Sequence, residues 1–453
     1  MDYEAIKRLY LENIKIDLEK SYESYNLGNN HHIITIHLLK QDDIICPYCA
    51  NNKITVRGSR LQIINYSSVL EDNLFIHLYR RVYKCNCCNK YFYEPNPFCD
   101  EGKQNSIYKD YKIIQALKDL TATYTSVAKQ FNVSPTYVSN IFDRKVDLAR
   151  LPLSKVICVD KVYSKRLSYH HYCFIIYSPR DRKIIDVLDS RHSDDLGDYF
   201  SRIPIEERDT VEFFSTDLYD SYRKIAKKYF PKAKICADPF HVIKNISNCV
   251  HAVRIDTMKK YSYLKGINDN YYWLFKSFWR LIMREPSKLS HKKFKVGRSG
   301  QYLSQVEIVE YMLKICPKLA TVYELYHEYR NFNDTATLEN TKEWLDEIII
   351  HFQSSEIEEM APAWRLLINW HDEIINSFNK VDNIRISNGP MERTNRDIKT
   401  IFRASFGSRN FKRMRNRIMF AMNSDSPMLY SSTKKTNKNI GKKRGKYNKK
   451  PKQ

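Results

Sequence analysis

The stretch TVEFFSTDLYDSYRKIAKKYF, from Thr210 to Phe230, joins a strand pattern to a helix pattern. Its apolar residues run up to Ser215, and the acid Asp217 follows almost at once. The residues after this acid have helical spacing, with Lys and Arg on one side. A carboxylate at the end of a strand often belongs to a site there, so we interpret Asp217 as functional. The alternative is that Asp217 caps a helix beginning at Leu218.

Strand and helix patterns on both sides extend this stretch into a domain. In chain order they are the strands KVICVD (155–160), YHHYCFIIYS (169–178) and KIIDVLDS (183–190), the helix SDDLGDYFSRI (193–203), the strand and helix of the opening stretch, and the strand AKICAD (233–238). This order, β-β-β-α-β-α-β, is that of the RNase H-like fold, in which a mixed sheet carries acids on its first and fourth strands.

Two acids end those two strands. Asp160 ends the first strand and Asp217 ends the fourth. If the strands are parallel neighbours, the carboxylates lie side by side, which is costly for like charges unless a divalent cation lies between them. The pattern therefore predicts a metal site at this edge of the sheet. The alternative for Asp160 is that it caps a turn.

The RNase H-like domain is predicted in two parts, residues 151–240 and 384–425. Between them, residues 241–383 show helix patterns only, which predicts an all-helical insertion. The fold class is therefore multidomain, with α+β and α/β parts.

The segment after the insertion, SNGPMERTNRDIK (387–399), begins with a turn and continues as a helix. Helical spacing at i, i+3 and i+7 puts Glu392, Asn395 and Lys399 on one face. Glu392 would supply the third carboxylate of a two-metal phosphoryl-transfer site. The alternative is that Glu392 only pairs with a neighbouring arginine of the same helix.

Two Cys-x-x-Cys pairs lie within residues 1–100, in CPYC and CNCC. Four thiols in two such pairs suit a tetrahedral zinc ion, and the residues between the pairs alternate like Arg-rich strands. We predict a zinc ribbon-like module that holds Zn²⁺ with Cys46, Cys49, Cys85 and Cys88. Cys87 is an alternative to Cys85 or Cys88, and Cys99 is a weaker candidate. Two unrelated cysteine pairs would be the other interpretation.

Three short helix patterns occupy residues 101–150. Before the third pattern, Ser134 can cap the helix and Pro135 can occupy its first turn. This spacing resembles a helix-turn-helix, whose recognition helix enters a DNA major groove. We predict DNA contacts from four polar residues that begin the third helix: Thr136, Tyr137, Ser139 and Asn140. The alternative is an ordinary three-helix packing unit.

The charge of the chain points to a polyanionic partner. Its 453 residues include 75 Lys or Arg and 52 Asp or Glu, a formal net charge of +23. Nucleic acid is favoured over a membrane, because no apolar run approaches the 18 or more residues of a spanning helix. The first 20 residues are charged throughout and predict no secretory signal. The C-terminal residues 426–453 are too basic and too poor in apolar residues to fold.

Four segments together carry a family resemblance: VICVD, FFSTDLYDSYRKI, ADPFHVIKN and SNGPMERTNRDIK. They resemble the Asp-Asp-Glu transposases of bacterial insertion sequences, specifically the ISL-three-type family, and the cysteine pairs and helix-turn-helix precede them in the family's usual order. Members commonly follow the first Asp with an acid, whereas Lys161 follows it here.

The resemblance implies an activity and its residues. Asp160, Asp217 and Glu392 would bind Mg²⁺ or Mn²⁺ and catalyse strand cleavage and strand transfer. Four further residues would support the site: Asp238, His241, Asn395 and Lys399. The partners would be double-stranded DNA, at the transposon ends and the target, and further copies of the chain on that DNA. The expected location is the cytoplasm, associated with the nucleoid when DNA is bound. The alternative is a catalytically inactive, transposase-derived DNA-binding protein or repressor.

Overall fold

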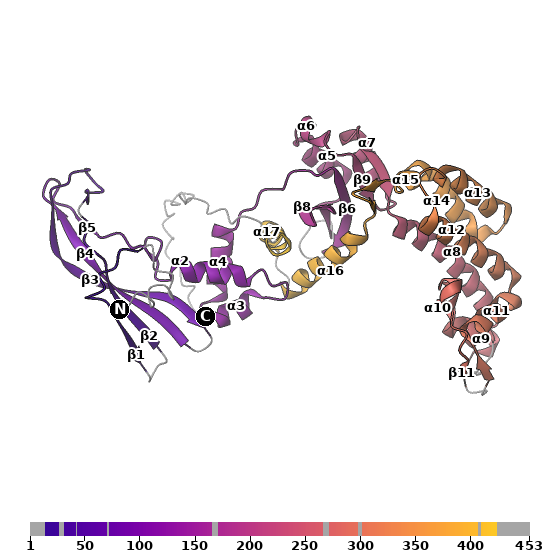
Figure 1. Cartoon of the computed structure of the whole chain (residues 1–453), viewed down its shortest axis with the longest axis horizontal. Coiled ribbons are helices and arrows are strands. Elements are labelled where there is room, and N and C mark those ends of the chain that lie inside the picture. The colour runs from indigo at the N-terminus through magenta and orange to yellow at the C-terminus, as the bar shows by residue number, and fades with distance from the viewer. Residues whose placement is uncertain are drawn as a thin grey trace, which may run out of the picture. The chain divides into compact units, whose positions relative to one another are not determined.

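The computed structural model describes residues 14–26, 31–41, 43–69, 72–164, 171–265, 271–297, 301–405 and 409–423 (Figure 1). The chain divides into two units, residues 1–149 with 400–453, and residues 150–399. The predicted basic tail, 426–453, lies outside the described residues. The predicted division into five segments stays a prediction.

The first unit contains a sheet in the order β1-β2-β4-β3, with β5 paired to β4. Its strands are β1 (Tyr22–Asn26), β2 (His31–His37), β3 (Ile54–Val69), β4 (Asp72–Cys85) and β5 (Tyr91–Tyr93). One face is buried because alternate residues such as Ile34, Ile64 and Ile76 pack in a single core. Cys99 lies in that core.

The same unit contains four described helices: α2 (Ile107–Ala116), α3 (Tyr124–Gln130), α4 (Pro135–Lys145) and α17 (Phe411–Met422). The α4 helix begins as its sequence predicts, because the Ser134 hydroxyl accepts a hydrogen bond from the Tyr137 amide and Pro135 fills the first turn. Buried Val127, Val138 and Phe142 hold α3 and α4 together.

The second unit contains a five-stranded sheet in the order β10-β9-β6-β7-β8. Its strands are β6 (Val156–Tyr163), β7 (Tyr172–Ser178), β8 (Lys183–Leu188), β9 (Phe213–Thr216) and β10 (Lys234–Ala237). Strand β7 is antiparallel to both of its neighbours, β6 and β8, whereas β9 is parallel to both β6 and β10. The sheet is therefore mixed, as the strand order predicts.

Alternation along the strands gives this sheet two different faces. Ile157, Val159 and Phe214 pack in the core under two helices, α5 (Ser193–Ser201) and α7 (Asp220–Tyr229). The short helix α6 (Ile205–Arg208), between them in the chain, has no buried residue. Val156 and Phe213 belong to a smaller cluster that includes Ile386, just before α16 (Gly389–Ala404). The even-numbered residues of β6 therefore face the α16 side.

The segment between β10 and α16 has its own hydrophobic core. Its helices are α8 (Pro239–Lys260), α9 (Tyr271–Ser277), α10 (Trp279–Ile282), α11 (Gln305–Ile315), α12 (Pro317–Thr335), α13 (Thr341–Ser354), α14 (Ala361–Asn369) and α15 (His371–Asn376), with short 3-10 turns at Ser262–Leu264, Pro286–Lys288 and Glu358–Met360. Helix α15 packs against β10, where the Asn376 amide donates to the Ile235 carbonyl.

The prediction of an all-helical insertion is wrong. Strands β11 (Phe294–Val296) and β12 (Gln301–Leu303) form a hairpin between α10 and α11, and the shorter strands β13 (Lys380–Val381) and β14 (Ile384–Arg385) pair near its end. Strands of two or three residues are too short to show alternation. None of the described helices is both long and apolar enough to span a membrane.

Candidate functional site

Asp160 and Asp217 come from neighbouring parallel strands. The register pairs Cys158 on β6 with Ser215 on β9, and each acid lies two residues beyond that pair. Asp160 does not end its strand as predicted, because β6 continues to Tyr163. The backbone amide of Lys161 donates to Asp160 at 2.7 Å. Burial raises the pKa of Asp160, and the nearby charge of Asp217 adds to the rise.

The Asp217 side chain is only 6% exposed and carries one strong charge partner. Its Oδ2 atom accepts from the Lys161 ammonium at 2.6 Å, whereas its buried Oδ1 atom has no hydrogen-bond partner among the described residues. The Lys161 ammonium also lies 5.4 Å from the centre of the Tyr219 ring. Helix α7 begins at Asp220, its N-cap is Tyr219 and no side chain caps it. The helix-cap alternative for Asp217 is therefore not what the structure contains.

Helix α16 is tied to the acids through asparagines. The Asn395 amide donates to the second carboxylate oxygen of Asp160 at 2.6 Å. At the start of the helix, the Asn388 amide group donates to the Val159 carbonyl at 3.2 Å, next to Asp160 in β6. Glu392 lies on the same helix and is exposed, as is Lys399. Among the described residues, no ion pair involves Glu392, so the alternative interpretation, pairing with a neighbouring arginine, is not what the structure contains.

Asp238 and His241 form a hydrogen-bonded pair beside these acids. His241 Nδ1 lies 2.7 Å from Asp238 Oδ2, and Asp238 Oδ1 accepts from the Asn388 backbone amide at 3.1 Å. Burial alone would lower the pKa of His241, but its bond to Asp238 and the nearby acids raise that pKa above the ordinary value. The pair therefore links the end of β10 to the start of α16.

The two predicted metal sites differ in how close their potential ligand atoms lie to one another. Among the residues that the structure describes, one group of three or more His, Cys, Asp or Glu places its ligand atoms within 4.8 Å of one another, and it is the four cysteines. Asp160, Asp217 and Glu392 are not drawn together to that distance. Asp160 on β6 and Asp217 just after β9 each accept hydrogen bonds from the protein, whereas Glu392 is exposed on α16.

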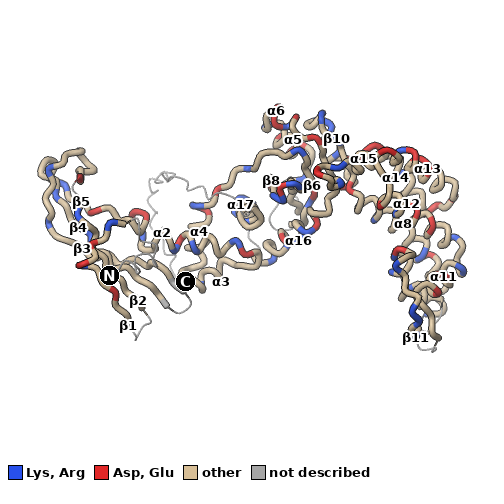
Figure 2. The backbone as a smooth tube through the Cα atoms, viewed as in Figure 1, with Lys and Arg blue, Asp and Glu red and all other residues tan. Residues whose placement is uncertain are grey.

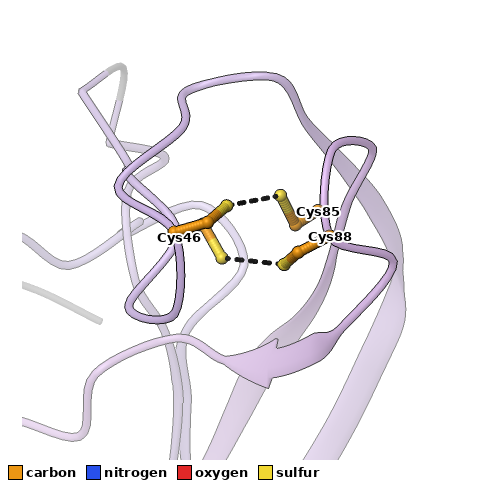
Figure 3. A group of neighbouring side chains, drawn as sticks. Cys46, Cys85 and Cys88 are labelled. Carbon is orange, nitrogen blue, oxygen red and sulfur yellow. Dashed lines mark hydrogen bonds between the residues drawn. The ribbon is translucent and has the colours of Figure 1, made fainter.

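The four cysteines come from two tight turns, and Figure 3 shows three of them, Cys46, Cys85 and Cys88. Cys46 and Cys49 lie before β3, whereas Cys85 ends β4 and Cys88 follows it. The sulfurs of Cys46 and Cys88 are 3.6 Å apart, and those of Cys49 and Cys85 are 3.5 Å apart. Backbone amides of the second turn donate to the sulfur of Cys85 and lower its pKa to about 6, which favours the thiolate. These four cysteines could hold a metal such as zinc. Cys87 is not in the group.

The four residues at the start of α4 differ in what they contact. Thr136 and Asn140 are exposed. Ser139 is half-buried, and its hydroxyl donates to the Thr136 carbonyl. The Tyr137 hydroxyl donates to Asp110 at 2.7 Å, and burial raises the pKa of Tyr137. Tyr137 therefore joins α4 to α2.

Comparison with known families identifies the chain. Residues 157–418, more than half of the chain, match the family model of the ISL3-type DDE transposases, whose description is "Transposase". The chain belongs to this transposase family. None of the curated proteins compared with it gives a match.

Two features of this transposase are not predicted by its sequence. One is the ion pair between Lys161 and Asp217. The other is α17, whose Phe420 ring lies 6.0 Å from that of Phe142 on α4 and whose Arg413 makes a two-pronged ion pair with Asp143. The apolar stripe of α17 is visible in the sequence, but nothing local indicates that it packs against residues far earlier in the chain.

Proposed function

We propose that this transposase binds the terminal inverted repeats of its insertion sequence and catalyses metal-dependent DNA cleavage and strand transfer. The observation that carries the proposal is the placement of Asp160 on β6 and Asp217 directly after the neighbouring parallel strand β9, with α16, the helix that carries Glu392, bonded to Asp160 through Asn395. The family match covers all three acids. The three acids lie far apart in the sequence of a strongly basic chain. Their convergence on one region of the fold is most simply explained by a role in the same reaction.

The strand arrangement supports an RNase H-like catalytic domain. Three antiparallel strands, β6, β7 and β8, continue into two parallel ones, β9 and β10, in one sheet. In this interpretation the helical segment with the β11–β12 hairpin is an insertion before the last helix of the domain, α16.

The donor set fits a hard divalent cation. Carboxylate oxygens are the ligands that Mg²⁺ and Mn²⁺ prefer, and Asp217 has a buried oxygen with no hydrogen-bond partner among the described residues. Asp160, Asp217 and Glu392 would hold the ions. When bound, such ions activate the attacking oxygen and stabilise the leaving one. Asn395 fixes the orientation of the Asp160 carboxylate, and the Asp238–His241 pair fixes the start of α16, so both act as positioning residues.

The N-terminal unit would supply recognition of the transposon ends. We interpret α3 and α4 as a helix-turn-helix in which exposed Thr136 and Asn140 can reach base edges, whereas Tyr137 sets the angle of α4 through Asp110. The cysteine cluster would bind Zn²⁺ and fix the ends of the β3–β4 hairpin. Action as a homo-oligomer on DNA belongs to the same proposal.

A second candidate function rests on Lys161. The Lys161 ammonium neutralises the Asp217 carboxylate. Family members commonly carry an acid, rather than a lysine, directly after the first Asp. A chain in which this pair persisted on DNA would bind transposon ends without cutting them, as a repressor does.

Cleavage of a labelled duplex that carries the element's terminal repeat separates the two functions. The transposase should nick it in Mg²⁺ and should stop when the metal is chelated, while a gel shift reports binding in both conditions. Specific binding without nicking in Mg²⁺ or Mn²⁺ would select the repressor.

A further inference from the structure

The β11–β12 hairpin is a firmly anchored projection of the insertion. Val296 on β11 and Leu289 before it are buried in the insertion's hydrophobic core. The Gln305 side chain accepts from both the Ser290 amide and the Arg284 guanidinium, which closes the base of the hairpin. Its exposed side chains are therefore held by a defined structure.

The outward side of the hairpin carries positive charge that nearby acids do not neutralise. In the antiparallel register Lys295 lies directly opposite Tyr302, so the two side chains share one face, and Tyr302 is 62% exposed. Lys288 and Lys293 in the same segment are paired with Glu285 and Glu307. Lys292 and Lys295, in contrast, are exposed and have no acidic partner among the described residues.

Charge is distributed unevenly over the insertion. Residues 284–297, which lead into and form β11, contain five Lys or Arg and one acid. Residues 339–373, which cover α13, α14 and the start of α15, contain nine acids and two Lys or Arg. Figure 2 shows this contrast, with blue around β11 and red along α13 to α15. A polyanion is attracted to the hairpin and repelled by the acidic helices.

We propose that the β11–β12 hairpin is a second DNA-binding surface, which holds the phosphate backbone of duplex DNA through Lys292 and Lys295, with Tyr302 against the sugar edge. The proposal rests on the proposed transposase function, because it assumes that the partner is DNA. The insertion would then contribute to DNA binding that does not depend on the DNA sequence, because backbone contacts position a protein but do not specify bases.

Salt-dependent binding of the full-length protein to a linear duplex without terminal repeats tests this surface. Each phosphate contact contributes about 0.9 to the slope of log affinity against log salt. The double variant Lys292→Gln/Lys295→Gln should therefore lower the slope by roughly 2 and weaken binding tens of times near 0.1 M salt. The matched control is Lys342→Gln/Arg365→Gln, which removes the same charge from exposed residues at the acidic end and should leave the slope nearly unchanged.

Each outcome decides the matter. Equal slopes for the wild type and the hairpin variant overturn the proposal, and equal losses in both double variants do so too, because net charge would then explain the effect. Self-association in the absence of DNA that is lost only in the hairpin variant, with unchanged DNA binding, would overturn it by assigning the hairpin to the acidic helices of a second copy. No binding of this duplex by the wild type would also overturn the proposal, and no binding of a terminal-repeat duplex as well would overturn the proposed function itself.

Discussion

The cysteine cluster and the carboxylate site are both groups of potential metal ligands, but the chain assembles them in different ways. The cysteines come from two turns at the same end of one hairpin, and their four sulfurs lie within 4.8 Å of one another. The acids come from β6, the end of β9 and α16. Asp160 is hydrogen-bonded to Asn395, Asp217 is paired with Lys161, and Glu392 is exposed to solvent. A ligand set from two local turns is complete once the hairpin forms, whereas the acids depend on three distant segments.

This difference predicts that substitutions at the two sites affect different properties, the stability of the fold at one and the chemistry at the other. A structural zinc site is part of the folding free energy of its module. A catalytic carboxylate site is held by the surrounding sheet and helix, so that its loss affects chemistry more than stability.

The largest effect is expected in the cysteine cluster. Cys46→Ser should release the metal and unfold the β3–β4 end of the N-terminal unit, because structural zinc contributes about 10–16 kcal/mol in small modules. Elemental analysis and circular dichroism measure both changes. Cys87→Ser is the matched control, since Cys87 is exposed, adjacent in sequence and outside the group. Equal metal content in wild type and Cys46→Ser would show that the cluster holds no ion.

A smaller loss is expected where a distant helix completes the N-terminal unit. Phe420 on α17 is fully buried, so Phe420→Ala should destabilise this unit by about 3–5 kcal/mol. Urea unfolding followed by limited proteolysis of α2 to α4 measures the change. Phe420→Leu should restore most of the stability. If the proteolysis midpoint of Phe420→Ala matched that of the wild type, α17 would not be part of the folded unit.

The smallest change in free energy is expected when the ion pair between Lys161 and Asp217 is removed. Lys161→Gln removes the cation that competes for Asp217, so cleavage should need roughly threefold to tenfold less Mg²⁺, a difference of about 1 kcal/mol. Lys161→Arg keeps the charge and should resemble the wild type. The measurement is the Mg²⁺ midpoint of cleavage. An unchanged midpoint in Lys161→Gln would mean that the ion pair does not oppose metal binding.

The same contrast explains what the sequence predicts. Cys-x-x-Cys spacing is local, and it identifies the ligand set down to the choice between Cys87 and its neighbours. Ser134 and Pro135 likewise mark the start of α4. The strand order predicts the mixed sheet. It also predicts that Asp160 lies near Asp217, because the carboxyl ends of neighbouring parallel strands lie side by side.

Features that depend on tertiary packing could not be predicted in this way. The partner of Asp217 is set by the direction of the Lys161 side chain, and the packing of α17 depends on segments far apart in sequence. The β11–β12 hairpin is not evident from the sequence, because its strands have three residues each. Asp160 lies within β6, because the strand continues through Lys161 and Val162 to Tyr163. The charged Lys161 interrupts the apolar pattern, so this continuation is not evident from the sequence.

The proposed catalytic role of the carboxylates is tested most directly by the cleavage activity of Asp217→Asn. This change keeps the size of a buried side chain and removes the charge that a divalent cation requires. Asp220→Asn is the matched control, because Asp220 is three residues away, exposed and paired with Arg223. Both variants should fold and shift a terminal-repeat duplex on a gel.

We predict that Asp217→Asn nicks this duplex below detection in Mg²⁺ while its binding stays equal to or tighter than that of the wild type, and that Asp220→Asn cleaves normally. Asp160→Asn and Glu392→Gln should behave like Asp217→Asn, and their combination should add little, because in the proposed mechanism the three acids would act as one unit. Cleavage by Asp217→Asn at the rate of the wild type would contradict the assignment of these carboxylates to catalysis.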